Sequence, residues 1–288
     1  YRTLGSDIVQ TNAHLIYLVF EEMGGAVKYS AMGEAPEVEK RPLSAIDEIE
    51  KFSADKVWSK VSQRPEFRHA MEVTRHMVAA EGQDKLPIAM SYAPFSLAGM
   101  LMGVQEFMEA IFDEEASVAT LLDFSTDIVT RFLQAHVDAG AEAIFVADPV
   151  ASGDLISPDT FAEYSLPRIK AVTATFKEQG LPAMLHICGN TEKRLVPLRG
   201  SGIAAFSMDS VDLDTALSLV DGNYTVMGNL SPSAVLLEKS SHEVGCLCRS
   251  LIATANGNGR FVLMPGCDLS PITDLANIKA MVEAAHTA

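Results

Sequence analysis

The sequence predicts an α/β protein of the (β/α)8 TIM-barrel type. Short apolar runs alternate with longer helical patterns from about residue 86 onward, which is typical of a parallel sheet with helices outside it. Several runs are almost continuously apolar, as in strands buried on both faces. The chain length of 288 residues also suits this fold, which typically takes about 250 residues. An open doubly wound sheet competes, but no G-x-G-x-x-G follows the first strand.

Six apolar runs are the clearest strand candidates, and a weaker seventh precedes them. The six are residues 86–92, 143–148, 183–188, 203–209, 224–229 and 261–267, and the weaker one is 25–30. These units approach the eight of a complete barrel. We therefore expect the first barrel strand to be absent from this chain, which opens on Tyr1 rather than Met.

Serine–proline steps predict where three helices begin. Ser157, Ser231 and Ser270 each precede a proline, so each is a candidate N-cap with the proline in the first helical turn. A long amphipathic helix is expected over 114–139, ended by Gly140. Upstream, SAID at 44–47 resembles a capping box with Asp in place of Glu.

Composition narrows the class of protein and its partners. The chain is 48% hydrophobic and 21% charged, with a formal net charge of −16, which disfavours nucleic acid because phosphate binding needs a basic surface. No run of 18 or more apolar residues predicts a membrane span. Four cysteines are too few for a disulfide scaffold and favour an intracellular, cytoplasmic protein with free thiols. The sequence shows no linker and no low-complexity segment, so we expect residues 1–288 to form one domain.

Polar groups gather where the predicted strands end, which is where barrels carry their chemistry. The residues at these ends are Tyr92, Asp148, His186 with Cys188, Asp209, Asn229 and Cys267. We expect them to converge on one cavity.

His186 and Cys188 form the strongest candidate site. Residues i and i+2 of a strand share a face, so both side chains can point into the barrel mouth. With Cys267 they fit a three-ligand zinc site with one position open, which Asp209 could fill or guard. The alternative is that they are packed core side chains, because Cys is among the most buried residue types.

A second pair of possible metal ligands, which we call the rival pair, and three other histidines are weaker candidates for a metal site. His242 and Cys246 share a helical face but fall on the outer ring of helices. The remaining helical histidines, such as His69, His76 and His136, are expected to be structural.

Two motifs, LHICG and PGCDLSP, resemble those of the methylcobamide:thiol methyltransferases in the uroporphyrinogen decarboxylase superfamily. SYAPFSLAGML at 91–101 and the stretch 138–170 are similar to other superfamily segments. The resemblance implies that His186, Cys188 and Cys267 bind Zn²⁺ and that the zinc activates a thiol such as coenzyme M. Cobalamin-independent methionine synthases use similar zinc chemistry with an acidic ligand, which would fall near Asp209.

The expected function is therefore transfer of a methyl group from a methylated corrinoid to a zinc-activated thiol. No D-x-H-x-x-G is present, so the corrinoid would arrive free, as methylcobalamin, or on a partner protein. Three alternatives stay open: demethylation of a methylated or methoxylated substrate onto a corrinoid, decarboxylation of a tetrapyrrole, and a closed structural zinc site.

Individual roles are expected as follows. Asp148, Asp209 and Tyr92 are the candidate catalytic residues, and Asn229 and Ser231 are the candidate cofactor-binding residues. The loops MGNLSP and MPGCDLSP, each leading into a Ser-Pro helix start, are expected to hold an anionic end of the acceptor.

Overall fold

A curled sheet of seven parallel strands forms the centre of the molecule. The computed structural model describes residues 3–30, 36–255 and 260–287. The strands pair in chain order, and each runs parallel to its neighbour. They are β1 (Ile8–Gln10), β4 (Leu86–Tyr92), β5 (Ala143–Ala147), β6 (Ala183–His186), β7 (Ala205–Ser207), β8 (Thr225–Leu230) and β9 (Phe261–Pro265).

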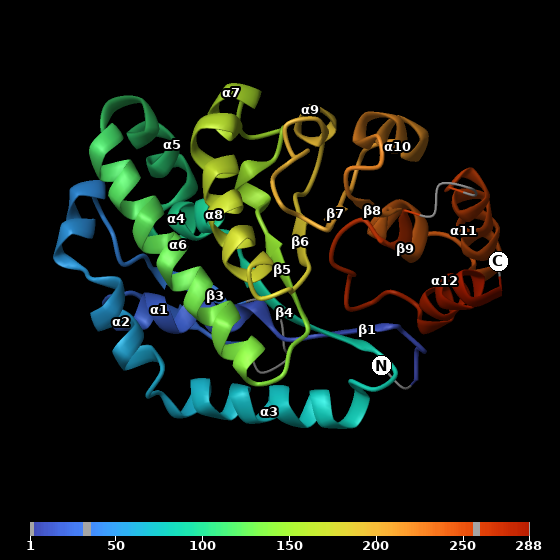
Figure 1. Ribbon diagram of the computed structural model, residues 1–288, viewed down its shortest axis with the longest axis horizontal. Coiled ribbons are helices and arrows are strands. Elements are labelled where there is room, and N and C mark those ends of the chain that lie inside the picture. Colours follow the sequence, from blue (N-terminus) through green and yellow to red (C-terminus); the bar gives the residue numbers. More distant parts are fainter. Residues whose placement is uncertain (1–2, 31–35, 256–259, 288) are drawn as a thin grey trace.

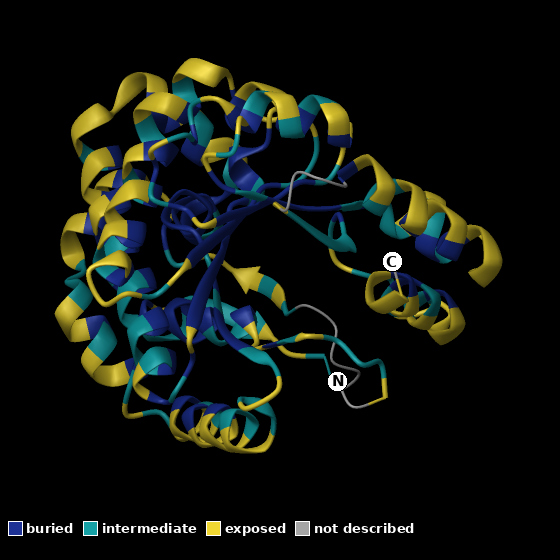
Figure 2. Cartoon of the chain, turned by 45° about the vertical axis from the view of Figure 1, so that its right-hand side comes forward, coloured by how far each residue is buried: buried dark blue, intermediate teal, exposed yellow. Residues whose placement is uncertain are grey.

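Helices cover the outside of this sheet (Figure 1). They are α1 (Tyr17–Glu22), α2 (Ala54–Val61), α3 (Pro65–Glu81), α4 (Pro94–Met102), α5 (Val104–Asp113), α6 (Glu115–Asp138), α7 (Pro158–Thr160), α8 (Leu166–Lys177), α9 (Glu192–Leu195), α10 (Leu213–Val220), α11 (Ser241–Ala255) and α12 (Leu275–Thr287). Five short 3-10 or π segments join them: η1 (Ala13–Ile16), η2 (Ile46–Lys51), η3 (Pro149–Ala151), η4 (Phe161–Ser165) and η5 (Pro232–Leu237). Figure 2 shows buried strands inside and helices whose outer faces are exposed.

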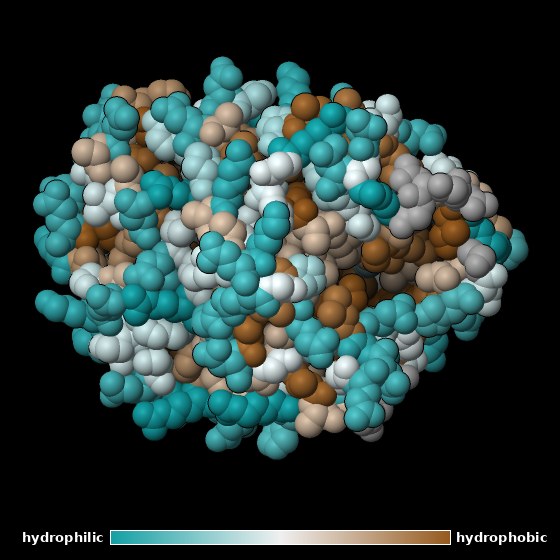
Figure 3. Space-filling model, in the orientation of Figure 1, coloured by the Kyte–Doolittle hydropathy of each residue, from teal (hydrophilic) through white to brown (hydrophobic). Residues whose placement is uncertain are grey.

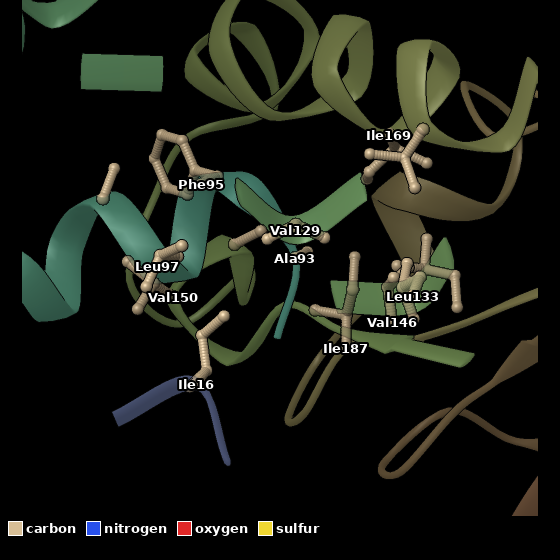
Figure 4. Packing of buried hydrophobic residues seen from close by; sticks show 14 of the residues in the cluster. Ile16, Ala93, Phe95, Leu97, Val129, Leu133, Val146, Val150, Ile169 and Ile187 are labelled. Atoms are coloured by element: carbon tan, nitrogen blue, oxygen red, sulfur yellow. The ribbon is translucent and has the colours of Figure 1, made fainter. Parts of the chain in front are cut away.

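Alternate residues of each strand enter two different cores. Val146 and Leu185 belong to the large core between sheet and helices. Figure 4 shows Val146 next to Leu133 of α6. Phe145 and Met184 belong to a separate, smaller core on the concave side of the sheet. Because successive side chains of a strand point to opposite faces, the nearly continuous apolar runs supply both cores at once.

Six predicted strands are confirmed, with ends that shift by a few residues. Residues 86–92 match β4 in full, whereas the predicted run 203–209 is reduced to β7 at 205–207. The expectation for 25–30 is wrong as a barrel strand. That segment holds β2 (Ala26–Lys28), which pairs antiparallel with β3 (Glu37–Lys40) in a separate two-stranded sheet.

The first strand of the sheet is β1, which pairs with β4 and was not among the predicted runs. Its three residues, IVQ, are too few to show a hydrophobic period. Within the described residues the sheet ends at β1 on one side and β9 on the other. The structure thus has a seven-stranded, barrel-like sheet, and the closed eight-stranded barrel stays a prediction.

Two of the three predicted serine caps are confirmed. The hydroxyl oxygens of Ser157 and Ser231 accept hydrogen bonds from the backbone N–H groups of Thr160 and Ala234. Ser270 is not a cap, because the next helix, α12, begins only at Leu275. The intervening residues form a turn closed by a backbone bond to the Ser270 carbonyl.

The other two helix signals have different outcomes. The long helix is confirmed as α6, and Gly140 follows it with φ of 107°, a conformation that favours glycine. At residues 44–47 the capping carboxylate belongs to Glu48 rather than Asp47. It accepts hydrogen bonds from the backbone N–H groups of Ser44 and Ala45.

In the described ranges, no single helix is long and apolar enough to cross a membrane. Only α4 and α5 taken together reach that length and composition, and these two helices meet at an angle of 104°.

Candidate metal centre

The structure brings His186, Cys188 and Cys267 together. The ligand atoms of the three side chains all lie within 4.8 Å of one another. His186 Nε2 is 3.1 Å from Cys188 Sγ, which in turn is 3.6 Å from Cys267 Sγ. We call these three residues the triad.

Sheet curvature brings the two thiols within reach. His186 is the last residue of β6, and Cys267 lies just beyond the end of β9, with β7 and β8 between the two strands. Neighbouring strands are about 4.8 Å apart, so three steps across a flat sheet would separate these ends by roughly 14 Å. The observed Sγ–Sγ distance of 3.6 Å therefore requires the strand ends to bend toward one another.

Strand alternation directs the triad into the concave side. Ile187, between the two ligands, is fully buried in the outer core with the helices. His186 and Cys188 consequently point the other way and line a cavity of about 580 Å³. We call it the central cavity.

Ser207, at the end of the neighbouring strand β7, orients the His186 ring. The Nδ1 atom lies 3.1 Å from the Ser207 carbonyl oxygen and 3.0 Å from its hydroxyl oxygen. A carbonyl can only accept, so these partners assign the ring proton to Nδ1. Nε2 then keeps its lone pair and faces Cys188, which is the arrangement of a metal-ligating histidine.

A hydrogen bond joins the two thiols, whose sulfur atoms are 3.6 Å apart. This bond is the main cause that lowers the pKa of Cys267 to about 5. The same bond to Cys267, reinforced by burial, raises the pKa of Cys188. Cys267 therefore ionises more readily than Cys188, and Cys188 would lose its proton on binding a cation.

Two carboxylates fix the loop that follows Cys188. Asp209 Oδ2 accepts a hydrogen bond of 3.1 Å from the Gly189 N–H, and Asp154 Oδ2 accepts one of the same length from the Asn190 N–H. Gly189 has φ of 69°, and a Cβ built on it would lie 2.1 Å from Asp154 Oδ2. Only glycine fits this position, which explains why the strand motif ends in Gly.

A second cavity of about 540 Å³ adjoins the triad, and we call it the side cavity. It shares Cys267, Asp268 and Leu269 with the central cavity. Its wall includes Asp209 and Ser231, so the loop after β8 and the loop after β9 do meet beside Cys267.

Of the strand-end residues, Tyr92, His186, Cys188 and Cys267 line the central cavity. Burial raises the pKa of the Tyr92 hydroxyl, which stays protonated at neutral pH. Asp209 lines only the side cavity. The expected convergence of all the strand ends on one cavity is therefore wrong, because the Asp148 and Asn229 side chains are engaged elsewhere.

Asp148 is fully buried and lines neither cavity. Its carboxylate accepts hydrogen bonds from the Ser96 N–H and hydroxyl and from the Ser165 hydroxyl. Burial raises the pKa of Asp148 despite these donors. The Asn229 amide instead donates to the Val211 carbonyl at 2.6 Å. These contacts link loops and helices around the site.

The expected anion site lacks its physical basis. The helix start expected at Ser270 is absent, and η5 is a π segment of six residues. Moreover, the charged side chains on the wall of the side cavity are the carboxylates of Asp209 and Asp268. These charges repel an anion.

The rival pair lies on α11. His242 Nε2 and Cys246 Sγ are 3.7 Å apart on its exposed surface. In the part of the chain that the structure describes, only the triad groups three possible metal ligands. His69 and His76 are exposed on α3, whereas His136 is buried and contacts the Thr74 hydroxyl at 2.9 Å.

Sequence reasoning missed Ser207, Asp154 and Asp268. Ser207 lies inside the predicted run 203–209, two residues before the polar end that drew attention. Asp154 acts from a loop 36 residues away from its partner Asn190. Asp268 follows Cys267 directly in PGCDLSP, and this position next to a candidate ligand was the one sequence signal that could have identified it.

Known proteins share much of the sequence and the fold of this chain. The sequence pattern of the family described as "Uroporphyrinogen decarboxylase (URO-D)" matches residues 1–288. The methylcobamide:CoM methyltransferase MtbA of Methanosarcina acetivorans is 31% identical over 266 residues, which are 92% of this chain and 75% of that protein. A uroporphyrinogen decarboxylase of Carboxydothermus hydrogenoformans is 26% identical, covering 99% of this chain and 79% of its own. A solved methyltransferase from Methanosarcina mazei superposes with a TM-score of 0.87 at 25% identity, covering 99% of this chain and 81% of that one.

Proposed function

This chain belongs to the uroporphyrinogen decarboxylase family, and on that premise we propose that it moves a methyl group from a methylated corrinoid to a zinc-activated thiol. The similarity of this chain to known methyltransferases identifies it as an enzyme of that class. The triad of His186, Cys188 and Cys267 is the observation that carries the rest of the proposal. A decarboxylation that needs no metal gives no reason to gather two thiols and an imidazole at one strand edge.

The donor set fits Zn²⁺. Imidazole nitrogen and thiolate sulfur are preferred zinc ligands, and three protein ligands are typical of catalytic sites that keep a fourth position open. His186 is already oriented by Ser207, and the Cys188 loop is already fixed by Asp209 and Asp154. Asp209 stays a proposed guard or ligand of the fourth position.

When bound, the zinc would deprotonate a coordinated thiol near neutral pH and leave it nucleophilic. The residues of the chain do the rest. The central cavity, with Tyr92, Phe145 and Met264 in its wall, would hold the reacting groups beside the triad. In the proposed transfer a sulfur–carbon bond would form as the cobalt–carbon bond of the methylcorrinoid substrate breaks, and the cobalt would keep the electron pair.

The other proposed roles follow from position. Tyr92 stays protonated and lines the central cavity, where its hydroxyl could donate a hydrogen bond to a substrate. Ser231 could contact a substrate from the side cavity. For Asp148 and Asn229 we propose indirect effects, because each supports neighbouring backbone through the hydrogen bonds described above.

Partners and location are part of the same proposal. The methyl donor would be a corrinoid protein or free methylcobalamin, and the acceptor a small thiol. Four free cysteines support the proposal of a cytoplasmic location. We also propose that the chain forms a single domain. The reverse use of the site, demethylation of a substrate onto a corrinoid, would involve the same triad.

Spectroscopy with methylcobalamin tests this function. Zinc-loaded protein, methylcobalamin and excess thiol should lose the methylcobalamin absorbance in proportion to the protein added. Cys188→Ala should fall to the uncatalysed rate, whereas Cys246→Ala, which alters an exposed thiol outside the triad, should keep the wild-type rate. A Cys188→Ala protein as active as wild type would contradict the proposal.

A further inference from the structure

We propose that a cavity beside helix α3 is a second ligand site. It would bind an uncharged, largely apolar molecule that donates one hydroxyl or N–H hydrogen bond to Nε2 of His136. We call this space the α3 cavity. The site does not include the triad, so the inference goes beyond the proposed function.

The α3 cavity has the size and the wall of a small-molecule site. Its volume of about 830 Å³ lies within the range of about 300–1,000 Å³ that such sites span. One face of α3 supplies Ala70, Val73, Thr74 and Met77, which follow the three- and four-residue spacing of a helix face. Leu18 of α1 adds to this largely apolar wall.

His136 of α6 places a buried polar atom without a partner in this wall. The residue lines the α3 cavity and is only 2% exposed. Among the residues that the structure describes, its Nε2 atom has no hydrogen-bond partner. Because buried polar atoms are normally paired, this nitrogen marks the position where a polar atom of a ligand would be stabilising.

The other nitrogen of the same ring determines that Nε2 accepts. Thr74 Oγ1 lies 2.9 Å from His136 Nδ1 and donates its own proton to the Ala70 carbonyl at 3.0 Å. Both contacts are hydrogen bonds only if Nδ1 carries the ring proton and donates it to Thr74. Nε2 then has a free lone pair, so its partner has to be a donor.

Burial also determines the charge of this ligand. It lowers the pKa of His136 to about 4, so the ring is uncharged near neutral pH. A charged donor would lose its hydration at this depth and would find no opposite charge on the ring. An uncharged hydroxyl or N–H group satisfies Nε2 without that cost.

The cation in the described part of the wall does not favour an anion. Arg64 Nη2 lies 2.9 Å from a carboxylate oxygen of Glu21 and 3.1 Å from one of Glu66. Its Nη1 lies 3.3 Å from a carboxylate oxygen of Glu22. Three carboxylates therefore already compensate the guanidinium charge, and an anionic ligand would compete with all of them.

The α3 cavity adjoins the central cavity but has residues of its own. Gln10, Thr11 and His14 are among the residues that line both. Ala70 and His136 line the α3 cavity and not the central cavity. Substitutions at these two positions therefore distinguish a ligand in the α3 cavity from one beside the triad.

Two fluorinated rings of similar shape test the hydrogen bond to His136. We would titrate the full chain with 4-fluorophenol and with 4-fluorotoluene, which carries a methyl group in place of the hydroxyl, and follow binding by fluorine NMR. Both probes should bind wild type saturably. His136→Leu should weaken binding of 4-fluorophenol roughly fivefold and change that of 4-fluorotoluene by less than about twofold, because only the phenol loses a hydrogen bond.

A second pair of variants tests the cavity itself. Ala70→Leu places a larger side chain in the α3 cavity and should prevent saturable binding of either probe. Ala80→Leu makes the same change at an exposed position of the same helix and should bind both probes as wild type does. This pair keeps the test decisive if His136→Leu does not fold.

A third probe, 4-fluorobenzylamine, is a cation at neutral pH and tests the charge. It should bind wild type more weakly than 4-fluorophenol does. Cation binding as tight as that of the phenol, no saturable binding of the phenol, equal binding by Ala70→Leu and Ala80→Leu, or an unchanged phenol affinity in folded His136→Leu would each overturn the inference. Methyl transfer from methylcobalamin is measured separately, so the proposed function stands or falls independently.

Discussion

At the scale of single residues, the site depends on which atom each side chain presents. Ser207 holds Nδ1 of His186, so Nε2 is left for a metal, and Cys267 ionises more readily than Cys188. Each of these features would favour the binding of a divalent cation by the triad. Each can also be removed by one substitution.

Removal of one thiol should abolish metal binding. Cys188→Ala leaves one histidine and one cysteine, which are too few for a tight zinc site. We expect about one zinc per chain in wild type and close to none in the variant, as measured by elemental analysis after dialysis. Cys246→Ala serves as the matched control, and equal zinc in wild type and Cys188→Ala would refute the assignment.

Removal of the Ser207 hydroxyl should weaken the site without destroying it. Ser207→Ala deletes one partner of His186 Nδ1 at 3.0 Å but keeps the carbonyl at 3.1 Å. Loss of such an outer partner typically costs about 10- to 100-fold in metal affinity, and the retained carbonyl argues for the lower end. Competition against a chelator measures the change, and an unaltered affinity would show that the carbonyl alone orients the ring.

At the scale of elements, the strand pattern explains both what the sequence could predict and what it could not. The runs that became β4, β5 and β6 were predicted because their apolar residues fill two cores at once. Their polar ends led directly to His186 and Cys188. By contrast, β1 is too short to show a period, and 25–30 was misassigned because pairing with β3 cannot be read from one segment.

The surroundings of the site could be predicted only in part, because they include contacts between segments that are distant in the chain. Strand alternation is local, so it places His186 and Cys188 on one face. The contacts of Asp154 with Asn190 and of Ser207 with His186 join segments 36 and 21 positions apart. Those contacts depend on loop geometry and on the curl of the sheet, which local periodicity does not encode.

The buried contact between helices α3 and α6 should make the free energy of unfolding depend on pH. His136 of α6 is buried against Thr74 of α3, and burial lowers its pKa from 6.5 to about 4. Between these pH values the unfolded chain binds a proton that folded His136 does not. Its contribution is therefore complete above about pH 6.5 and is lost as the pH falls toward 4.

Replacement of His136 should flatten this slope. In wild type the free energy of unfolding should decrease on acidification by up to about 1.4 kcal/mol per pH unit from this group. His136→Gln should lose that component, whereas His76→Gln, at an exposed position of α3, should keep it. Urea unfolding at several pH values gives the slopes, and parallel slopes for wild type and His136→Gln would contradict the burial argument.

At the scale of the whole molecule, the curled sheet turns distant strand ends into one site. Cys188 and Cys267 lie 79 positions apart in the chain, yet their sulfur atoms are 3.6 Å apart. Hydrophilic and hydrophobic residues alternate on the face seen in Figure 3, and the chain has a formal net charge of −16. The fold thus gathers one imidazole and two thiols, which are soft ligands, at one place in an acidic protein.

The central claim is that the triad holds one zinc with a position open to a thiol. X-ray absorption at the zinc edge tests it most directly, because sulfur and nitrogen ligands differ in distance, at about 2.3 Å and 2.0–2.1 Å. Zinc-loaded protein should show two sulfurs and one imidazole nitrogen, and addition of 2-mercaptoethanol should add a third sulfur. A shell without two sulfurs, or one that excess thiol leaves unchanged, would contradict the account.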